Sequence, residues 1–349
     1  MALSLETISD QPGGGPSTPG SVTLPVTTRC VLHERYGGPD VLRVGEREIG
    51  ALEPDQVLVR IHASSVNPVE WYGVAGFWIG RFGNGLRVPR SPLVGADLAG
   101  RVVAVGSGVT SLQVGDEVFG TGAGAWGEHA VARETKVAPK PPAVSFEDAA
   151  AVPIAGLTAL QAVRDKGNVQ PGSCVLINGA SGGVGTFAVQ LARWLGADVT
   201  AVCSTPNVDL ARSLGANRVV DYRQEDFTKL GERHDVMIDI AGSRPFRQFR
   251  RVLAPDATVV VVGAPLSTRG LGPLSHIIGT KLAAIGRRQS VVFFVAKINR
   301  EDLALMAELL VAGTVRTVID RRFEGLGAAP DGLLYLGEGH ARGKIVISV

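Results

Sequence analysis

The chain has 349 residues, 45% of them hydrophobic, so it can bury a sizeable core and is expected to form two domains. Its formal net charge of +2 is close to balance, which argues against nucleic acid or an anionic membrane as a partner. No apolar run is long enough for a membrane helix, and three widely spaced cysteines without a CxxC pair indicate a reducing, cytoplasmic compartment.

Residues 1–27 differ in composition from the rest of the chain. The stretch 11–20 reads Gln-Pro-Gly-Gly-Gly-Pro-Ser-Thr-Pro-Gly, which is typical of a flexible segment and predicts a disordered leader. It has neither the basic nor the apolar part of a secretory signal, so we do not expect it to be one.

Short strands and turns dominate residues 28–150. Apolar residues alternate along 57–63 and 100–106, and 114–120 is a further strand bounded by turns. This spacing predicts a small β-barrel-like domain. The last run of the chain again has strand texture, and we expect residues 318–349 to complete this first domain.

Strands and helices alternate over residues 151–317. This alternation is typical of a doubly wound parallel sheet, so the predicted fold class is α/β. The apolar strands of this second domain are predicted near 174–178, 199–204, 218–221, 235–240 and 258–263.

The turn after the first of these strands is the most informative segment. Apolar residues 175–178 lead into Gly179-Ala180-Ser181-Gly182-Gly183-Val184-Gly185, and an amphipathic helix follows at once. Gly179 allows a sharp turn, and Gly185 allows the helix to pack closely on the strand. The backbone of Ser181, Gly182, Gly183 and Val184 is predicted to bind a pyrophosphate at the helix N-terminus, which makes this a dinucleotide site.

The end of the second strand indicates which dinucleotide binds. An NAD site usually has a carboxylate here, but this chain has Ser204 and Thr205, with no carboxylate before Asp209. Two hydroxyls without a repelling charge favour the 2′-phosphate of NADPH. Pro206 stands where a basic phosphate partner would be expected, so Tyr222 is predicted to supply that contact, unless it is an ordinary strand-end aromatic.

Six segments carry a recognisable pattern in a fixed order: 36–42 (Tyr-Gly-Gly-Pro-Asp-Val-Leu), 67–71 (Asn-Pro-Val-Glu-Trp), 95–100 (Gly-Ala-Asp-Leu-Ala-Gly), 114–118 (Val-Gly-Asp-Glu-Val), 179–185 and 339–344 (Gly-His-Ala-Arg-Gly-Lys). Together they resemble the zinc-free, quinone oxidoreductase-like branch of the medium-chain dehydrogenase/reductase superfamily. The resemblance covers nearly everything from residue 28 onward. It implies a GroES-like catalytic domain, a Rossmann cofactor domain and a homodimer paired through the Rossmann sheets.

The resemblance also indicates that no metal is bound. Zinc-dependent relatives place a Cys near Pro68 and a Gly-His-Glu at residues 95–97, and many have a four-Cys lobe. Here the corresponding positions hold Asn67, Ala96 and Asp97, and the lobe is absent. Zinc needs three or four Cys, His or carboxylate ligands, so we expect a metal-free site.

Two residues are predicted to act on the substrate. The resemblance places Asn67 near the nicotinamide, where its amide can donate to a substrate carbonyl. Tyr72 is the best proton donor in reach, because its hydroxyl keeps its proton at neutral pH. Trp71, Phe77 and Trp78 are expected to form an apolar wall of the pocket, the alternative being that they are core aromatics.

Further cofactor contacts are predicted around the second sheet. Ala241 and Gly263 follow the fourth and fifth strands, and ligands of open α/β sheets bind at such carboxyl ends. The resemblance adds Thr158 and Phe294 beside the nicotinamide, and His340, Ala341 and Arg342 in a turn that closes on the cofactor. Helix packing for Thr158, core packing for Phe294 and a solvated turn for 340–342 are the alternatives.

These expectations agree on an NADPH-dependent, zinc-independent oxidoreductase that reduces quinones or α,β-unsaturated carbonyls by hydride transfer. Three alternatives are left open. One is an alcohol or aldehyde oxidoreductase of the same fold, and another is a non-catalytic NADPH-binding sensor or partner protein. The third is an enoyl reductase that serves a synthase in trans.

Overall fold

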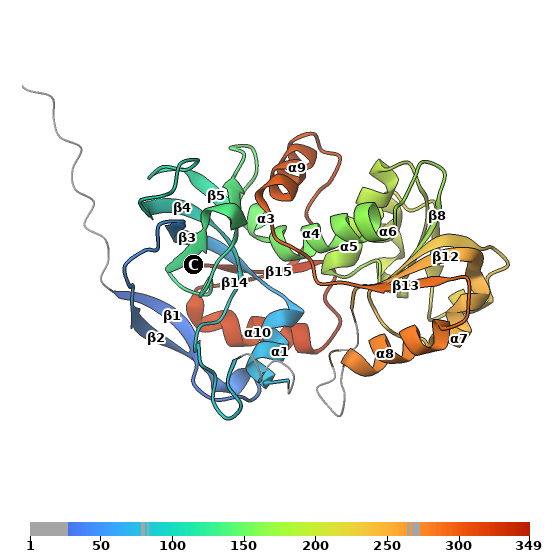
Figure 1. Cartoon of the computed structure of the whole chain (residues 1–349), viewed down its shortest axis with the longest axis horizontal. Coiled ribbons are helices and arrows are strands. Elements are labelled where there is room, and N and C mark those ends of the chain that lie inside the picture. The colour runs from blue at the N-terminus through green and yellow to red at the C-terminus, as the bar shows by residue number, and fades with distance from the viewer. Residues whose placement is uncertain (1–26, 78–80, 82–83, 264–265, 267–272) are drawn as a thin grey trace, which may run out of the picture.

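The computed structural model describes residues 27–77, 81, 84–263, 266 and 273–349. Residues 1–26 of the predicted leader and Trp78 lie outside the described part of the chain. Figure 1 shows two sheets lying side by side, with the early strands on the left and the later parallel strands on the right. The chain crosses from the first sheet to the second and returns to the first at its end.

The first sheet has seven strands in the order β14-β15-β3-β4-β5-β7, with β6 paired to β3, and a separate two-stranded ribbon joins β1 to β2. The alternation predicted along β3 is confirmed, because Val57, Val59 and Ile61 are buried in one apolar cluster with Val102 and Val118. The strands of this half are β1 (Thr27–His33), β2 (Leu42–Glu48), β3 (Gln56–Val66), β4 (Asp97–Val105), β5 (Glu117–Thr121), β6 (His129–Arg133), β7 (Val137–Pro139), β14 (Ile319–Glu324) and β15 (Lys344–Ser348). Its helices are α1 (Pro68–Ala75), α3 (Phe146–Ala150) and α10 (Ala329–Gly337).

The second sheet has six strands in the order β10-β9-β8-β11-β12-β13, all parallel. Counted along the chain, that order is third, second, first, fourth, fifth, sixth, which confirms the doubly wound sheet. The strands are β8 (Cys174–Asn178), β9 (Asp198–Cys203), β10 (Arg218–Asp221), β11 (His234–Asp239), β12 (Leu253–Val261) and β13 (Ser290–Phe293). The helices are α4 (Pro153–Gln161), α5 (Gly183–Trp194), α6 (Val208–Ser213), α7 (Phe246–Phe249), α8 (Pro273–Ala284) and α9 (Arg300–Val311).

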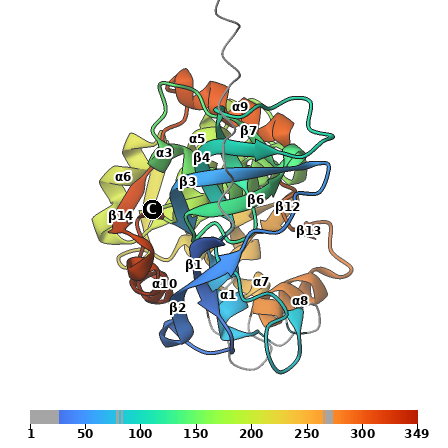
Figure 2. The same ribbon diagram turned by 90° about the vertical axis from the view of Figure 1, so that its left-hand side faces the viewer.

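The last strand of the chain returns to the first sheet. β15 pairs antiparallel with β3, with Ile345 opposite Val66, and it pairs parallel with β14. Figure 2 shows β14 and α10 at the side of this sheet. Just before β15, Gly343 forms an isolated bridge with Gly182 in the glycine-rich turn, so the C-terminal segment joins the two halves.

All three cysteines are free thiols, and Cys30 and Cys203 are buried. Burial raises the pKa of both thiols, that of Cys203 to about 11, so neither is a reactive thiolate at neutral pH. Among the helices described, none has the length and apolar character needed to cross a membrane.

Candidate functional site

The glycine-rich turn lies between β8 and α5 at the carboxyl edge of the second sheet. Gly179 has φ +93°, a left-handed conformation that glycine adopts without strain, and the turn ends at Gly182, the N-cap of α5. The first turn of a helix leaves its N–H groups without partners inside the helix, and the dipole adds positive charge there. The arrangement predicted for a pyrophosphate is therefore present in the backbone.

The glycines of this turn differ in the free space around their Cα atoms. A methyl group on Gly185 would overlap the carbonyl oxygen of Gly179, which confirms that this glycine allows the close packing of helix and strand. A methyl group on Gly182 would meet nothing closer than 3.7 Å, and one on Gly183 would lie 3.0 Å from Cδ of Lys344. The open side at Gly182 is where a ligand can approach the backbone.

Two neighbouring strand ends border this turn. The N–H of Ala241 donates to the carbonyl of Asn178 at 3.2 Å, and a methyl group on Gly179 would lie 3.2 Å from that same nitrogen. Gly263 passes so close to the carbonyl of Ile240 that a side chain there would collide with it. The structure thus brings Ala241 and Gly263 beside the glycine-rich turn.

Asn207, which the sequence analysis missed, connects the turn to the end of β9. Its side-chain nitrogen donates to the hydroxyls of Ser181 at 3.1 Å and Ser204 at 3.0 Å. Its Oδ1 atom is buried and has no hydrogen-bond partner within the described part of the chain. A buried acceptor without a donor is costly, so this oxygen marks a place where a ligand hydroxyl fits.

A carboxylate also lies near the end of β9, although that end of the strand has none in its own sequence. Asp221 ends β10 opposite Cys203, and a hydrogen bond from Thr205 is the main cause that lowers its pKa. Its other donors are the N–H of Arg223 and the side chain of Gln224. The next residue, Tyr222, donates its N–H to the carbonyl of Cys203 at 3.0 Å. Tyr222 is 51% exposed. The predicted residues Ser204, Thr205 and Tyr222 therefore gather at one site, with Asp221 among them.

A buried polar network lies where α1 begins, and Asp97 is at its centre. The Oδ2 atom of Asp97 accepts from Ser65 at 2.6 Å and from Asn67 at 2.9 Å, while its Oδ1 accepts from the N–H of Ile154 at 3.0 Å. The ammonium of Lys344 lies 3.6 Å from the same carboxylate. Burial raises the pKa of Asp97 and lowers that of Lys344, while the attraction between them acts in the opposite direction on each.

Lys344 also holds the amide of Asn67. Its ammonium donates to Oδ1 of Asn67 at 2.5 Å and to the carbonyl of Val66 at 3.2 Å. The amide nitrogen of Asn67 donates to Asp97 and makes a longer contact of 3.5 Å with Ser65. Sequence reasoning gave Lys344 no role, because its contact with Asn67 depends on the pairing of β15 with β3. The role of Asn67 toward a substrate stays a prediction, with one amide hydrogen only weakly engaged.

Glu70 closes the network from inside α1. Its two carboxylate oxygens accept from the N–H groups of Asn67 at 2.8 Å and Ala96 at 3.1 Å. Burial, reinforced by the charge of Asp97, raises the pKa of Glu70 to about 8. Asn67 therefore has its backbone, its amide nitrogen and its amide oxygen all fixed.

Two aromatic residues, Trp71 and Tyr72, lie on α1. Trp71 donates from Nε1 to the carbonyl of Leu266 at 3.1 Å, and its ring packs against Gly337 of α10. Tyr72 is half-buried, with its ring centroid 6.0 Å from that of Phe77, and burial raises the pKa of its hydroxyl to about 12. Tyr72 is therefore protonated at neutral pH.

The remaining predicted contacts lie around the same region. Thr158 is half-buried on α4, and Phe294 follows β13 with Nζ of Lys166 5.8 Å above its ring. His340 and Arg342 are exposed in the turn that ends at the Gly343 bridge, where the N–H of Arg342 donates to Asp320 at 2.9 Å. Ala341 packs against an apolar cluster of the first half.

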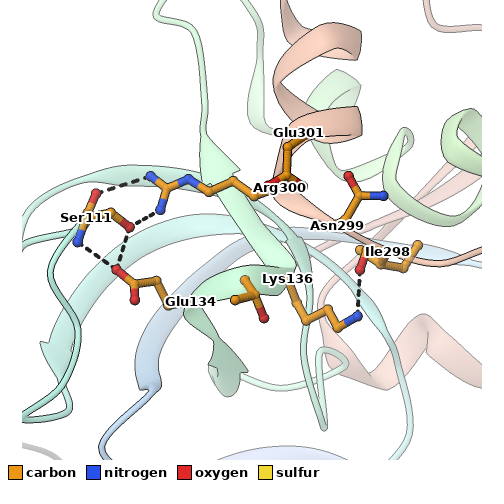
Figure 3. Close-up of a pocket in the computed structure, with 8 residues that line it drawn as sticks. Ser111, Glu134, Lys136, Ile298, Asn299, Arg300 and Glu301 are labelled. Carbon is orange, nitrogen blue, oxygen red and sulfur yellow. Dashed lines mark hydrogen bonds between the residues drawn. The ribbon is translucent and has the colours of Figure 1, made fainter.

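A separate groove of about 320 Å³ lies between the two halves at the start of α9 (Figure 3). Three of its charged side chains are bonded to the groove's own residues. Arg300 donates to Ser111, Glu134 accepts from the N–H of Ser111 at 2.6 Å, and Lys136 donates to the carbonyl of Ile298 at 2.6 Å. None of the residues predicted for the cofactor or substrate lines this groove, and its bonds instead connect the two halves.

Comparisons with known proteins agree with this geometry. Two family models match, the alcohol dehydrogenase GroES-like domain at residues 53–142 and the zinc-binding dehydrogenase at residues 214–347. The chloroplast envelope quinone oxidoreductase homolog of Arabidopsis thaliana is 34% identical over 308 residues, covering 84% of this chain and 89% of the relative. The 2-methylene-furan-3-one reductase of Solanum lycopersicum is 30% identical over 359 residues, covering 99% and 85%. The solved structure of the quinone oxidoreductase from Coxiella burnetii has a TM-score of 0.80 at 30% identity, covering 93% of this chain and 99% of that one.

Proposed function

This chain belongs to the quinone oxidoreductase-like branch of the medium-chain dehydrogenase/reductase superfamily, and from that premise we propose that it is an NADPH-dependent, zinc-independent reductase of quinones and α,β-unsaturated carbonyls. The observation that carries the proposal is the bridge from Gly343 to Gly182. It brings the glycine-rich turn next to the network of Asn67, Asp97 and Lys344. A cofactor held on the turn would lie beside this network at the start of α1.

The cofactor is held by the backbone and by small polar side chains. Gly183 presents its N–H to the pyrophosphate beside the open backbone of Gly182, and the buried Oδ1 of Asn207 accepts from a ribose hydroxyl. Ser204, Thr205 and Tyr222 bind the 2′-phosphate, and the carboxylate of Asp221 beside them is held by hydrogen bonds from Thr205, the N–H of Arg223 and Gln224. When bound, NADPH supplies the hydride.

Tyr72 stabilises the oxygen of the substrate and gives it a proton. A quinone or enone that accepts a hydride at carbon gathers negative charge on its carbonyl oxygen, which a nearby hydroxyl stabilises. The pKa of about 12 keeps Tyr72 protonated, so it donates at all physiological pH values. The relatives named as a quinone oxidoreductase homolog and a furanone reductase support this substrate class.

The residues at the metal position of zinc-dependent relatives do not fit a zinc ion. Among the described residues, no three His, Cys, Asp or Glu side chains are placed to hold a metal. The one carboxylate there, Asp97, already accepts from Ser65, Asn67 and the N–H of Ile154 and pairs with Lys344. The ammonium of Lys344 supplies the positive charge at this position, and the carbonyl is polarised by hydrogen bonds alone.

The test is the oxidation of NADPH by chelator-treated protein with a panel of quinones, enones, aldehydes and alcohols. We expect turnover of quinones or enones with NADPH that chelation does not change. Activity on simple alcohols that depends on added zinc would instead identify an alcohol or aldehyde oxidoreductase. Tight NADPH binding without turnover of any substrate would identify a sensor or partner protein.

The preference for NADPH is tested by Ser204→Asp. A carboxylate at this position repels the 2′-phosphate, so we expect the Kd for NADPH to rise about tenfold or more while that for NADH changes little. Ser107→Asp adds the same charge on an exposed turn of the first half and serves as the control. An unchanged ratio of the two Kd values in Ser204→Asp would place the phosphate elsewhere.

We further propose that the protein is a homodimer joined through the second sheet. β13 is paired only with β12 among the described strands, so its outer edge is free to pair with a second copy. Exposed apolar side chains lie next to that edge: Ile278, Leu282 and Ile285 on or just after α8, and Phe293 and Val295 on or just after β13.

The free thiols fit a reducing compartment such as the cytoplasm.

A further inference from the structure

Arginine side chains gather at the edge of the second sheet that faces away from the glycine-rich turn. β11, β12 and β13 are parallel, so their first residues, His234, Leu253 and Ser290, lie at one edge and the turn lies at the other. A hollow of about 480 Å³ opens at this far edge. It is lined by Arg233, Arg250, Arg251, Pro255, Gly286, Arg287, Arg288 and Gln289.

A second hollow adjoins the first and shares Arg251 with it. Its volume is about 430 Å³, and it adds three cations, Lys229, Arg244 and Arg247, and one carboxylate, Asp226. We call the two together the arginine hollows. The net charge of the whole chain is only +2, so these cations are concentrated here rather than being part of a generally basic surface.

Most of these cations lack a carboxylate partner. Arg288 pairs with Asp256 at 2.5 Å and Lys229 lies 4.0 Å from Asp226, but the other six form no ion pair with any described residue. Two are held by backbone carbonyls instead, because Arg233 donates to Leu253 and Arg287 donates to Ala283, each at 2.9 Å. In the groove of Figure 3, by contrast, Glu134 and Arg300 are both bonded to Ser111, so the negative and the positive charge lie beside the same residue.

We propose that the arginine hollows bind a small molecule carrying two or more phosphate groups, at a site separate from the cofactor cleft. The six cations that have no ion-pair partner among the described residues repel one another, and a bound anion removes that cost. The planar guanidinium group forms paired hydrogen bonds with phosphate oxygens, which suits this ligand better than a single carboxylate. Each hollow is of the size that small-molecule sites have, and a concave surface fits a soluble ligand better than a flat membrane.

The test uses protein saturated with NADP⁺, so that phosphate cannot bind in the cofactor cleft, and titrates it with inorganic tripolyphosphate in a calorimeter. We expect saturable binding that weakens as salt is raised. Arg250→Gln with Arg251→Gln should weaken it at least tenfold. Arg29→Gln with Arg35→Gln removes two exposed arginines of the first half and should leave the affinity unchanged.

The proposal is overturned if tripolyphosphate does not bind, or if both double variants lower the affinity equally. It is also overturned if the protein binds phosphatidylserine vesicles and tripolyphosphate does not displace them, because the surface is then a membrane contact. Arg287→Gln alone, in the segment after α8 that lines the same hollow from another element, tests the site independently and should weaken binding several-fold. Quinone reduction should be unchanged in all these variants, since none of the residues lies at the cofactor turn.

Discussion

At the level of single residues, Tyr72 offers the most direct test of the chemistry. Tyr72→Phe removes the hydroxyl and keeps the ring, so we expect kcat to fall about 10²-fold or more while the affinity for NADPH is unchanged. Tyr36→Phe is the matched control, because its hydroxyl donates to the backbone carbonyls of Asn84 and Gly85 and it is not among the predicted site residues. Equal losses of kcat and of NADPH affinity in Tyr72→Phe would mean that the hydroxyl is structural.

Glu70 gives the protein a stability that depends on pH. Its pKa in the folded state is about 8 against an ordinary 4.5, so between these values the folded state keeps a proton that the unfolded state releases. Stability contributed by that proton is therefore full below pH 4.5 and is lost as the pH rises toward 8. We expect the free energy of unfolding, measured by urea denaturation, to fall across this range.

Glu70→Gln tests the source of this slope. Glutamine cannot ionise, so the pH dependence should flatten even though the variant loses one acceptor for a backbone N–H and is less stable overall. Asp148→Asn changes a carboxyl at the exposed start of α3 and should leave the slope intact. The same slope in Glu70→Gln as in the unmodified protein would assign the titration to another group.

At the level of elements, the turn into α5 contains one glycine needed for packing and another needed for cofactor binding. Gly185→Ala forces a methyl group into the carbonyl oxygen of Gly179, so we expect a loss of about 1–3 kcal/mol in stability together with a loss of cofactor affinity. Gly182→Ala meets nothing closer than 3.7 Å and should keep the stability while weakening NADPH binding. Thermal unfolding and NADPH titration of both variants decide this, and a Gly182→Ala protein with normal affinity would contradict the proposed pyrophosphate position.

The elements also show what sequence reasoning can reach. The glycine-rich turn was predictable because its strand, turn and helix are contiguous and each glycine has a local role. Asn207, Asp221 and Lys344 were not, because each acts across a pairing that the sequence does not reveal. Asp221 reaches Thr205 only because β10 lies beside β9, and Lys344 reaches Asn67 only because β15 pairs with β3.

At the level of the whole molecule, the two halves meet through the last strand. Lys344 lies in β15 of the first sheet, packs its stem near Gly183 of the second half and bonds Asn67 at the start of α1. The domain boundaries near residues 150 and 317 stay a prediction from the sequence. A substitution of Lys344 is therefore expected to alter both the packing at the cofactor turn and the position of the Asn67 amide.

The free edge of the second sheet leads to the last prediction. Ile285 is 74% exposed and Val295 is 79% exposed, and burying both against a second copy stabilises a dimer. Ile285→Glu with Val295→Glu places two charges in that interface, so light scattering should change from twice 36.4 kDa to the mass of a single chain. Val114→Glu, at an equally apolar but remote position of the first half, should stay dimeric. An unmodified protein that is monomeric at micromolar concentration, or a double variant that still dimerises, would show that this edge faces solvent.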